Sequence, residues 1–188
     1  MISKHKTGLI ISLVVFVVLF FVSYKLSRLI SDDAVIKTWI ATYGYFVAIF
    51  VSFITGFKFI VPVPTITFLP IFVSAGLSPL LIALLLAVGT SLAYIVEYAE
   101  SRKLLKNIQN KEALSWERRI IHWKQKHPAL PILFLFLYFS FVPLPSELTL
   151  PIATAHYRNT TVLTTAFLGH CVYNIFYGTW ILILFRTL

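Results

Sequence analysis

Five stretches of this chain contain no Asp, Glu, Lys or Arg: residues 7–24, 38–57, 59–96, 127–146 and 159–185. A helix that crosses the hydrocarbon core of a bilayer needs about 20 apolar residues, and the stretches approach or exceed that length. Of the 188 residues, 59% are hydrophobic and 12% are charged, whereas about 25% are charged in a typical soluble domain. The sequence therefore excludes a soluble globular protein and predicts an all-α, multi-pass membrane protein with a single membrane domain over 1–188.

The first uncharged stretch follows Lys4 and Lys6, as the apolar region of a signal peptide does. Its apolar core is longer than the usual region of about 7–15 residues, and no A-x-A cleavage site follows it. We expect residues 7–27 to form an uncleaved signal anchor that spans the membrane. A cleaved signal peptide is the alternative.

An internal repeat links the two halves of the chain. Residues 61–71 read VPVPTITFLPI, and residues 142–152 read VPLPSELTLPI. Because proline interrupts helices, each copy predicts the tip of a re-entrant helical hairpin. The expected tip residues are Pro62, Pro64 and Thr65 in the first copy and Pro143, Pro145 and Ser146 in the second. Thr65 and Ser146 should cap the returning half-helices, since their hydroxyls can accept the free N–H groups of a helix start.

Each hairpin precedes a long apolar span, which in the first copy should run from Ser78-Pro79 to about Val96. The chain then divides into a first repeat at 40–96, a linker at 97–128 and a second repeat at 129–187. Followed through the membrane, the two repeats are inverted, which is typical of transporters whose broken helices meet at the midplane. A competing topology makes 38–57 a full span and reverses the C-terminal half.

The linker 97–128 carries eight of the 16 Lys and Arg residues. Trp116, Ile120 and Trp123 recur there at helical spacing among basic residues, which is typical of an amphipathic helix on a membrane surface. A solvated connector is the alternative. In the inverted topology, eleven of the 16 positive charges share one side with the N-terminus and the linker. The positive-inside rule makes that side the cytoplasm, and we expect the plasma (inner) membrane.

Glu147, beside the second hairpin tip, is the one acidic residue in an expected membrane segment. An ionisable residue there is a functional candidate because it is costly to keep in lipid. Removal from water favours the protonated carboxyl group, so Glu147 is a candidate for proton exchange. The alternative is a structural charge at the first turn of a half-helix, where the helix dipole favours an acid.

Four further residues are candidates for binding substrate or protons. Lys58 could pair with Glu147 or hold a phosphate, or it could reach the interface as a snorkelling side chain. Arg158 is placed for a lipid phosphate at the cytoplasmic face, or serves as a topology marker. His156 and His170 could relay protons, and a packed, hydrogen-bonded histidine is the alternative for each.

The sequence contains no nucleotide-binding loop, zinc motif or hydrolase elbow. The one cysteine, Cys171, excludes a disulfide within the chain. We therefore expect no enzyme activity, cofactor, metal site or nucleic-acid partner. Gly76, Gly89, Gly169 and Gly178 are expected at close helix contacts.

Two hairpins with P-x-P tips, each followed by a long span, resemble the DedA superfamily, also called the SNARE-associated or VTT-domain family. The resemblance covers roughly residues 40–185. The family's first hairpin carries a P-x-P-G-E-like motif and then an A-G pair, and its late span carries an F…G…W pattern. The matching residues here are Pro62, Pro64, Ala75, Gly76, Phe167, Gly178 and Trp180. The family's acidic residue in the first hairpin is replaced by Thr65 and Ile66, and an acid occurs instead at Glu147, as in a divergent member.

The resemblance implies lipid translocation, because bacterial members are similar to transporters of undecaprenyl phosphate and eukaryotic members to phospholipid scramblases. We therefore expect a flippase or scramblase for an anionic lipid or a polyprenyl phosphate, with Glu147 as the candidate for proton coupling. Membrane lipids are the expected partners, and a second copy of the chain is a further candidate. Two alternatives stay open: a proton-driven exporter of small solutes, and a membrane assembly factor that binds a partner through the 97–128 helix.

Overall fold

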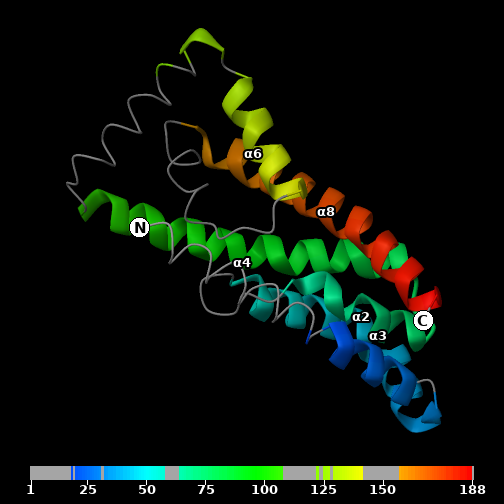
Figure 1. The fold of residues 1–188 in the computed structure, drawn as a ribbon. Coiled ribbons are helices and arrows are strands. Elements are labelled where there is room, and N and C mark those ends of the chain that lie inside the picture. The colour runs from blue at the N-terminus through cyan, green and yellow to red at the C-terminus, as the bar shows by residue number, and fades with distance from the viewer. Residues whose placement is uncertain are drawn as a thin grey trace, which may run out of the picture.

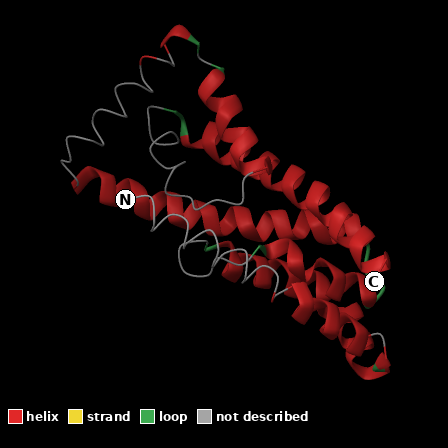
Figure 2. Cartoon of the chain, in the orientation of Figure 1, coloured by secondary structure: helices red, strands yellow, loops and turns green. Residues whose placement is uncertain are grey.

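The structure is a computed structural model that describes residues 18, 20–30, 32–57, 64–107, 122, 125–127, 129–141 and 157–187. All the regular structure in this part of the chain is helical (Figures 1 and 2), which confirms the all-α prediction for the residues described. The bounded elements are α2 (Ala34–Gly56), η1 (Thr65–Phe68), α3 (Leu69–Ser74), α4 (Pro79–Asn107), α6 (Leu130–Phe141) and α8 (Asn159–Thr187).

Three of these helices are long and apolar enough to cross a membrane: Ala34–Gly56, Pro79–Glu100 and Asn159–Phe185. Their outer faces carry large apolar side chains, such as Phe46, which is 74% exposed, and Trp180, which is 56% exposed. A water-soluble monomer rarely exposes apolar surface on this scale. The protein is therefore a membrane protein, with these faces directed at lipid.

The helix starts follow local chemistry. The Oδ1 atom of Asp33 accepts hydrogen bonds from the backbone N–H groups of Val35 (2.8 Å) and Ile36 (3.1 Å), which caps α2. Pro79 is the first residue of α4, where its missing N–H is not needed. The predicted start of this span at Ser78-Pro79 is confirmed.

Two sequence expectations need correction. α4 does not end near Val96 but continues to Asn107, because the residues beyond Val96 are mostly Glu, Lys, Arg, Leu and Ala, which favour helix in water as well. The first part of the predicted linker is therefore helical. Gly76 is not a helix contact: its φ is +93° and no atom lies within 4 Å of the position that a Cβ would take, so it serves the turn between α3 and α4.

α2 and α4 pack side by side and run in the same direction. Gly44 of α2 lies against Leu77, just before α4, and Gly56 at the end of α2 lies against Ala93. The segment 57–78 therefore returns the chain toward the start of α2, to the level of the middle of that helix. Whether 38–57 is a full span or half of a hairpin stays a prediction, since α2 is long and apolar enough to cross a membrane by itself. At 23 residues, α2 is nevertheless longer than the half-helix expected before the first tip.

α6 and α8 are also parallel. Gly169 of α8 lies against Phe139 of α6, and two turns further along α8 the Tyr177 hydroxyl donates to the carbonyl oxygen of Phe141 (3.0 Å). α4 and α8, by contrast, are antiparallel, since Tyr98 near the end of the apolar part of α4 meets Asn159 at the start of α8. Figure 1 shows α4 between α2 and α8, with α6 on the outer side of α8.

Two apolar clusters hold this arrangement. One joins η1, α3 and α4 to the end of α8 through Ile66, Leu69, Leu86 and Ile181. The other joins α4, α6 and the start of α8 and includes Tyr94, Tyr98, Tyr138 and Phe139. Residues 20–30 are helical and pack on the end of α8, where the Phe20 and Tyr24 rings contact Phe185. Most of the predicted anchor 7–27 lies outside the described residues.

Candidate functional site in the α4–α8 interface

The structure describes four of the eleven residues singled out from the sequence as site or hairpin-tip residues: Pro64, Thr65, Arg158 and His170. The other seven lie outside the described residues. They are Lys58, Pro62, Pro143, Pro145, Ser146, Glu147 and His156. Their predicted roles therefore stay predictions.

Thr65 is buried but does not cap a helix. The N-terminal cap of η1 is Pro64, and no side chain makes a capping hydrogen bond there. The Thr65 hydroxyl instead lies 3.3 Å from the Thr90 hydroxyl on α4. The prediction of an N-cap was wrong at this position because the turn is a short 3-10 segment, in which Thr67 donates to the Pro64 carbonyl oxygen. Thr65 thus ties the first hairpin segment to α4.

His170 lies inside the α4–α8 interface and is only 3% exposed. Its Nδ1 atom is 3.1 Å from the Ser91 hydroxyl of α4. The rings of Phe139 and Tyr94 flank the imidazole, at centroid distances of 5.1 Å and 6.3 Å. His170 is therefore a packed and hydrogen-bonded histidine. Because the imidazole lies next to other polar groups, this environment is also compatible with the predicted role of His170 as a proton carrier.

Two buried tyrosines continue the polar contacts toward the start of α8. The Tyr94 and Tyr98 rings stack at a centroid distance of 6.2 Å, and the Tyr98 hydroxyl donates to Asn159 Oδ1 at 3.3 Å. Glu97, on the same turn of α4, is half-buried. Sequence reasoning missed these tyrosines because tyrosine in a membrane segment is equally typical of the lipid interface.

Asn174 extends the polar contacts in the other direction along α8. It is 1% exposed, and its Nδ2 atom donates to the backbone carbonyl oxygen of His170 at 2.9 Å. An Asn deep in an apolar span is a signal that sequence analysis could have used, because polar amides are rare there and usually functional or structural. His170 and Asn159 face α4 through Ser91 and Tyr98, and Asn174 lies one turn further along α8 from His170.

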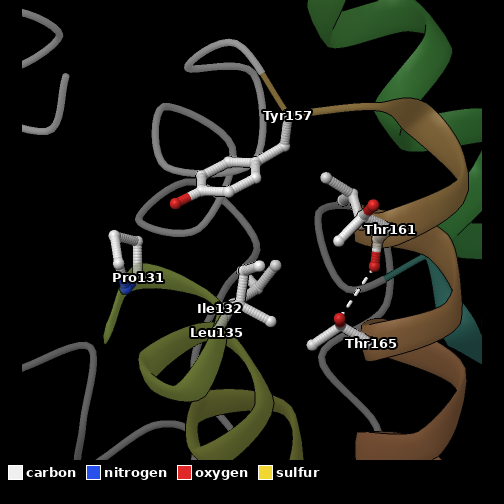
Figure 3. Close-up of a pocket in the computed structure, with 7 residues that line it drawn as sticks. Pro131, Ile132, Leu135, Tyr157, Thr161 and Thr165 are labelled. Carbon is white, nitrogen blue, oxygen red and sulfur yellow. Dashed lines mark hydrogen bonds between the residues drawn. The ribbon is translucent and has the colours of Figure 1, made fainter. Parts of the chain in front are cut away.

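Arg158 lies at a different place, just before α8, and is exposed. Next to it, Tyr157 borders a shallow depression between α6 and α8 (Figure 3). The Thr165 hydroxyl donates to the Thr161 carbonyl oxygen within α8 (2.7 Å), so this depression is mainly apolar. Partial burial raises the pKa of the Tyr157 phenol. The depression is lined by Pro131, Ile132, Leu135, Tyr157, Thr161, Val162 and Thr165.

Within the described ranges, no group of three or more His, Cys, Asp and Glu side chains is placed to hold a metal ion. Comparisons with protein-family models, curated proteins and solved structures found no match to this chain. The α4–α8 interface, with its row of buried hydroxyl, amide and imidazole groups, is therefore the candidate site on structural grounds alone.

Proposed function

We propose that this protein is a membrane transporter that moves a lipid or a polyprenyl phosphate across the bilayer. The observation that carries the proposal is the direction in which the packed helices run relative to one another. Each long helix, α4 or α8, packs parallel to the helix that precedes its V-P-x-P segment, while α4 and α8 are antiparallel to each other. Transporters with inverted repeats have this relation between their halves, and bind substrate where the broken helices meet.

The lengths of the elements support an inverted repeat of hairpin and span. α4 and α8 each have 29 residues and begin at Pro79 and Asn159, close to the 81-residue offset of the sequence repeat. Within them, Gly89 packs on the backbone of α2 and Gly169 on that of α6. These glycines occupy the same position in the two helices, so corresponding contacts join each span to its preceding helix.

In this proposal the two hairpin tips meet near the midplane and Glu147 exchanges a proton there. Lys58 and Arg158 supply positive charge for a phosphate, and His156 and His170 assist proton movement. Residues 97–128 and the N-terminus lie in the cytoplasm of the plasma (inner) membrane, where basic residues attract anionic head groups.

The outer surface of α6 favours a lipid over a small solute. The described part of α6 has 12 residues, fewer than the length needed to cross the hydrocarbon core. Leu133 and Phe134 on this helix are 51% and 56% exposed. In the proposal, this exposed apolar face gives a lipid access to the helices from the side, which a lipid substrate requires. A solute exporter requires a path closed from lipid.

Purified protein in liposomes with a fluorescent phospholipid or polyprenyl phosphate tests the proposal. Wild-type protein should speed the exchange of label between leaflets, and Glu147→Gln should return it to the rate of empty liposomes. Asp32→Asn is the matched control, because it removes an exposed acid outside the spans and should leave the rate unchanged. Wild-type protein that exchanges lipid no faster than empty liposomes would contradict the proposal.

A further inference from the structure

Polar side chains are buried at successive levels of the α4–α8 interface. Tyr98, Tyr94 and Ser91 come from α4, and His170 and Asn174 come from α8; each of the five is at most 9% exposed. Polar groups inside a membrane protein are costly unless they have partners or a function. Five such groups in one interface therefore need an explanation beyond packing.

The groups follow one another in short steps. Asn159, at the start of α8, binds the Tyr98 hydroxyl at 3.3 Å, and the Tyr98 ring stacks on Tyr94 at 6.2 Å. The Tyr94 ring is 6.3 Å from the imidazole of His170, which lies 3.1 Å from the Ser91 hydroxyl. The row therefore runs from the start of α8 toward the interior of the bundle.

The inner end of the row reaches the first hairpin segment. Thr90 is the neighbour of Ser91 in α4, and its hydroxyl lies 3.3 Å from that of Thr65 in η1. Both threonines are buried. The Thr65–Thr90 pair therefore lies one residue along α4 from the inner end of the row, and a water molecule would have to bridge the two.

Two polar atoms of the row can still form a hydrogen bond. The Tyr94 hydroxyl and Asn174 Oδ1 are buried and make no hydrogen bond to any residue that the structure describes. A buried polar atom without a partner costs about 1–3 kcal/mol. Such atoms next to a histidine are suited to water molecules that pass protons, because water can donate and accept at each step.

We propose that this row is a proton path that leads from the start of α8, through Tyr98, Tyr94 and His170, to Thr65 at the first hairpin. The inference rests on the proposed transport function and adds the route by which protons reach the substrate site. At His170 the neutral imidazole takes a proton from a water or hydroxyl group, so that an O–H bond breaks and an N–H bond forms, and the imidazolium then releases a proton to the next oxygen by the reverse exchange. The tyrosine hydroxyls and water pass protons to and from it.

Among the residues that the structure describes, the titratable groups around the path are Glu97, Tyr94 and Tyr98 on α4, Tyr138 on α6 and Tyr157 just before α8. Glu97 is half-buried at the outer end. On the proposed topology this end faces the cytoplasm, so Glu97 collects protons from that side.

The test uses full-length protein in liposomes that contain a pH-sensitive dye and a fluorescent lipid, with and without an imposed pH gradient. Tyr94→Phe removes one hydroxyl and keeps the ring stacked on Tyr98, and His170→Gln removes the titratable ring. Both should slow proton entry by about 100-fold or more, the scale on which a positioned proton-transfer group contributes. Tyr43→Phe, which removes an exposed hydroxyl on α2, is the control and should match wild type.

The two readouts separate this inference from the proposed function. Lipid exchange that a pH gradient accelerates in wild type, but not in Tyr94→Phe or His170→Gln, supports both. If the wild-type protein exchanges lipid and the two variants admit protons at the wild-type rate, the proton path is wrong and the proposal of lipid transport is unaffected. Proton entry that the variants lose, without any lipid exchange in wild type, supports the path and contradicts lipid transport. A wild-type protein with neither activity overturns both.

Discussion

Gly89 allows the backbones of α2 and α4 to touch. A Cβ atom at this position would collide with the Ser52 hydroxyl and the Ile49 carbonyl oxygen, and would lie 2.9 Å from the backbone nitrogen of Phe53. In lipid there is no hydrophobic driving force for two helices to associate. Close packing of this kind is therefore a main source of the affinity of one helix for another. Gly89 is therefore one of the residues on which the close packing of α2 and α4 depends.

Gly89→Ala should destabilise the protein by about 1–3 kcal/mol, the usual range for overpacking, because the nearest atoms belong partly to backbone and cannot rotate away. Gly44→Ala is the matched control, since its nearest neighbour is the tip of the flexible Leu77 side chain at 2.5 Å. Thermal unfolding in detergent, followed by reaction of Cys171 with a thiol dye, measures both variants. Equal melting temperatures for the two would contradict this role of Gly89.

Single residues were predictable from the sequence to different degrees. The contacts at Gly89, Gly169 and Gly178 are confirmed, whereas Gly76 serves a turn, because glycine suits both close contacts and positive φ. His170 stood out as a titratable residue in an apolar span. Tyr94 did not, since its burial depends on how α4 and α8 align, and no local pattern encodes that alignment.

Each long helix overlaps one of the uncharged stretches of the sequence. The residues at which the helices begin and end depend on the local sequence. The predicted start at Pro79 is confirmed because proline suits the first turn. The end of α4 was misjudged because charged residues mark the end of a membrane segment but do not end a helix. The length of α2 was misjudged for a related reason: its first turn lies before Thr38 and includes the charged Lys37, which the uncharged stretch excludes.

Asp33 should control the start of α2. Asp33→Ala removes the acceptor for the N–H groups of Val35 and Ile36 and should cost about 0.5–2 kcal/mol. Hydrogen exchange of these two amides should accelerate, while exchange in the rest of α2 stays slow. Asp33→Asn keeps an oxygen at the same position and should preserve protection. Unchanged exchange in Asp33→Ala would contradict the cap.

At the scale of the whole molecule, the sequence repeat predicted that the chain returns to one side before α4, and the parallel packing of α2 and α4 agrees with it. What the sequence could not supply is the side-by-side alignment of helices distant in the chain. The polar row arises only when Ser91 meets His170 and Tyr98 meets Asn159. The candidate site therefore belongs to the assembled bundle and to no single segment.

The directions of the helices predict a pattern of accessibility across the membrane. In a Cys171→Ser background, cysteines at Asp32, Ser78 and Thr187 should react with an impermeant thiol reagent from one side, and a cysteine at Thr160 from the other. The reason is that α2 and α4 are parallel, so the chain returns toward the start of α2 before α4 begins, while α8 runs antiparallel to α4. Labelling of intact and permeabilised cells measures this. Ser78 reacting from the side opposite to Asp32 would contradict the return of the chain before α4, and Thr187 reacting from the same side as Thr160 would contradict the antiparallel course of α8.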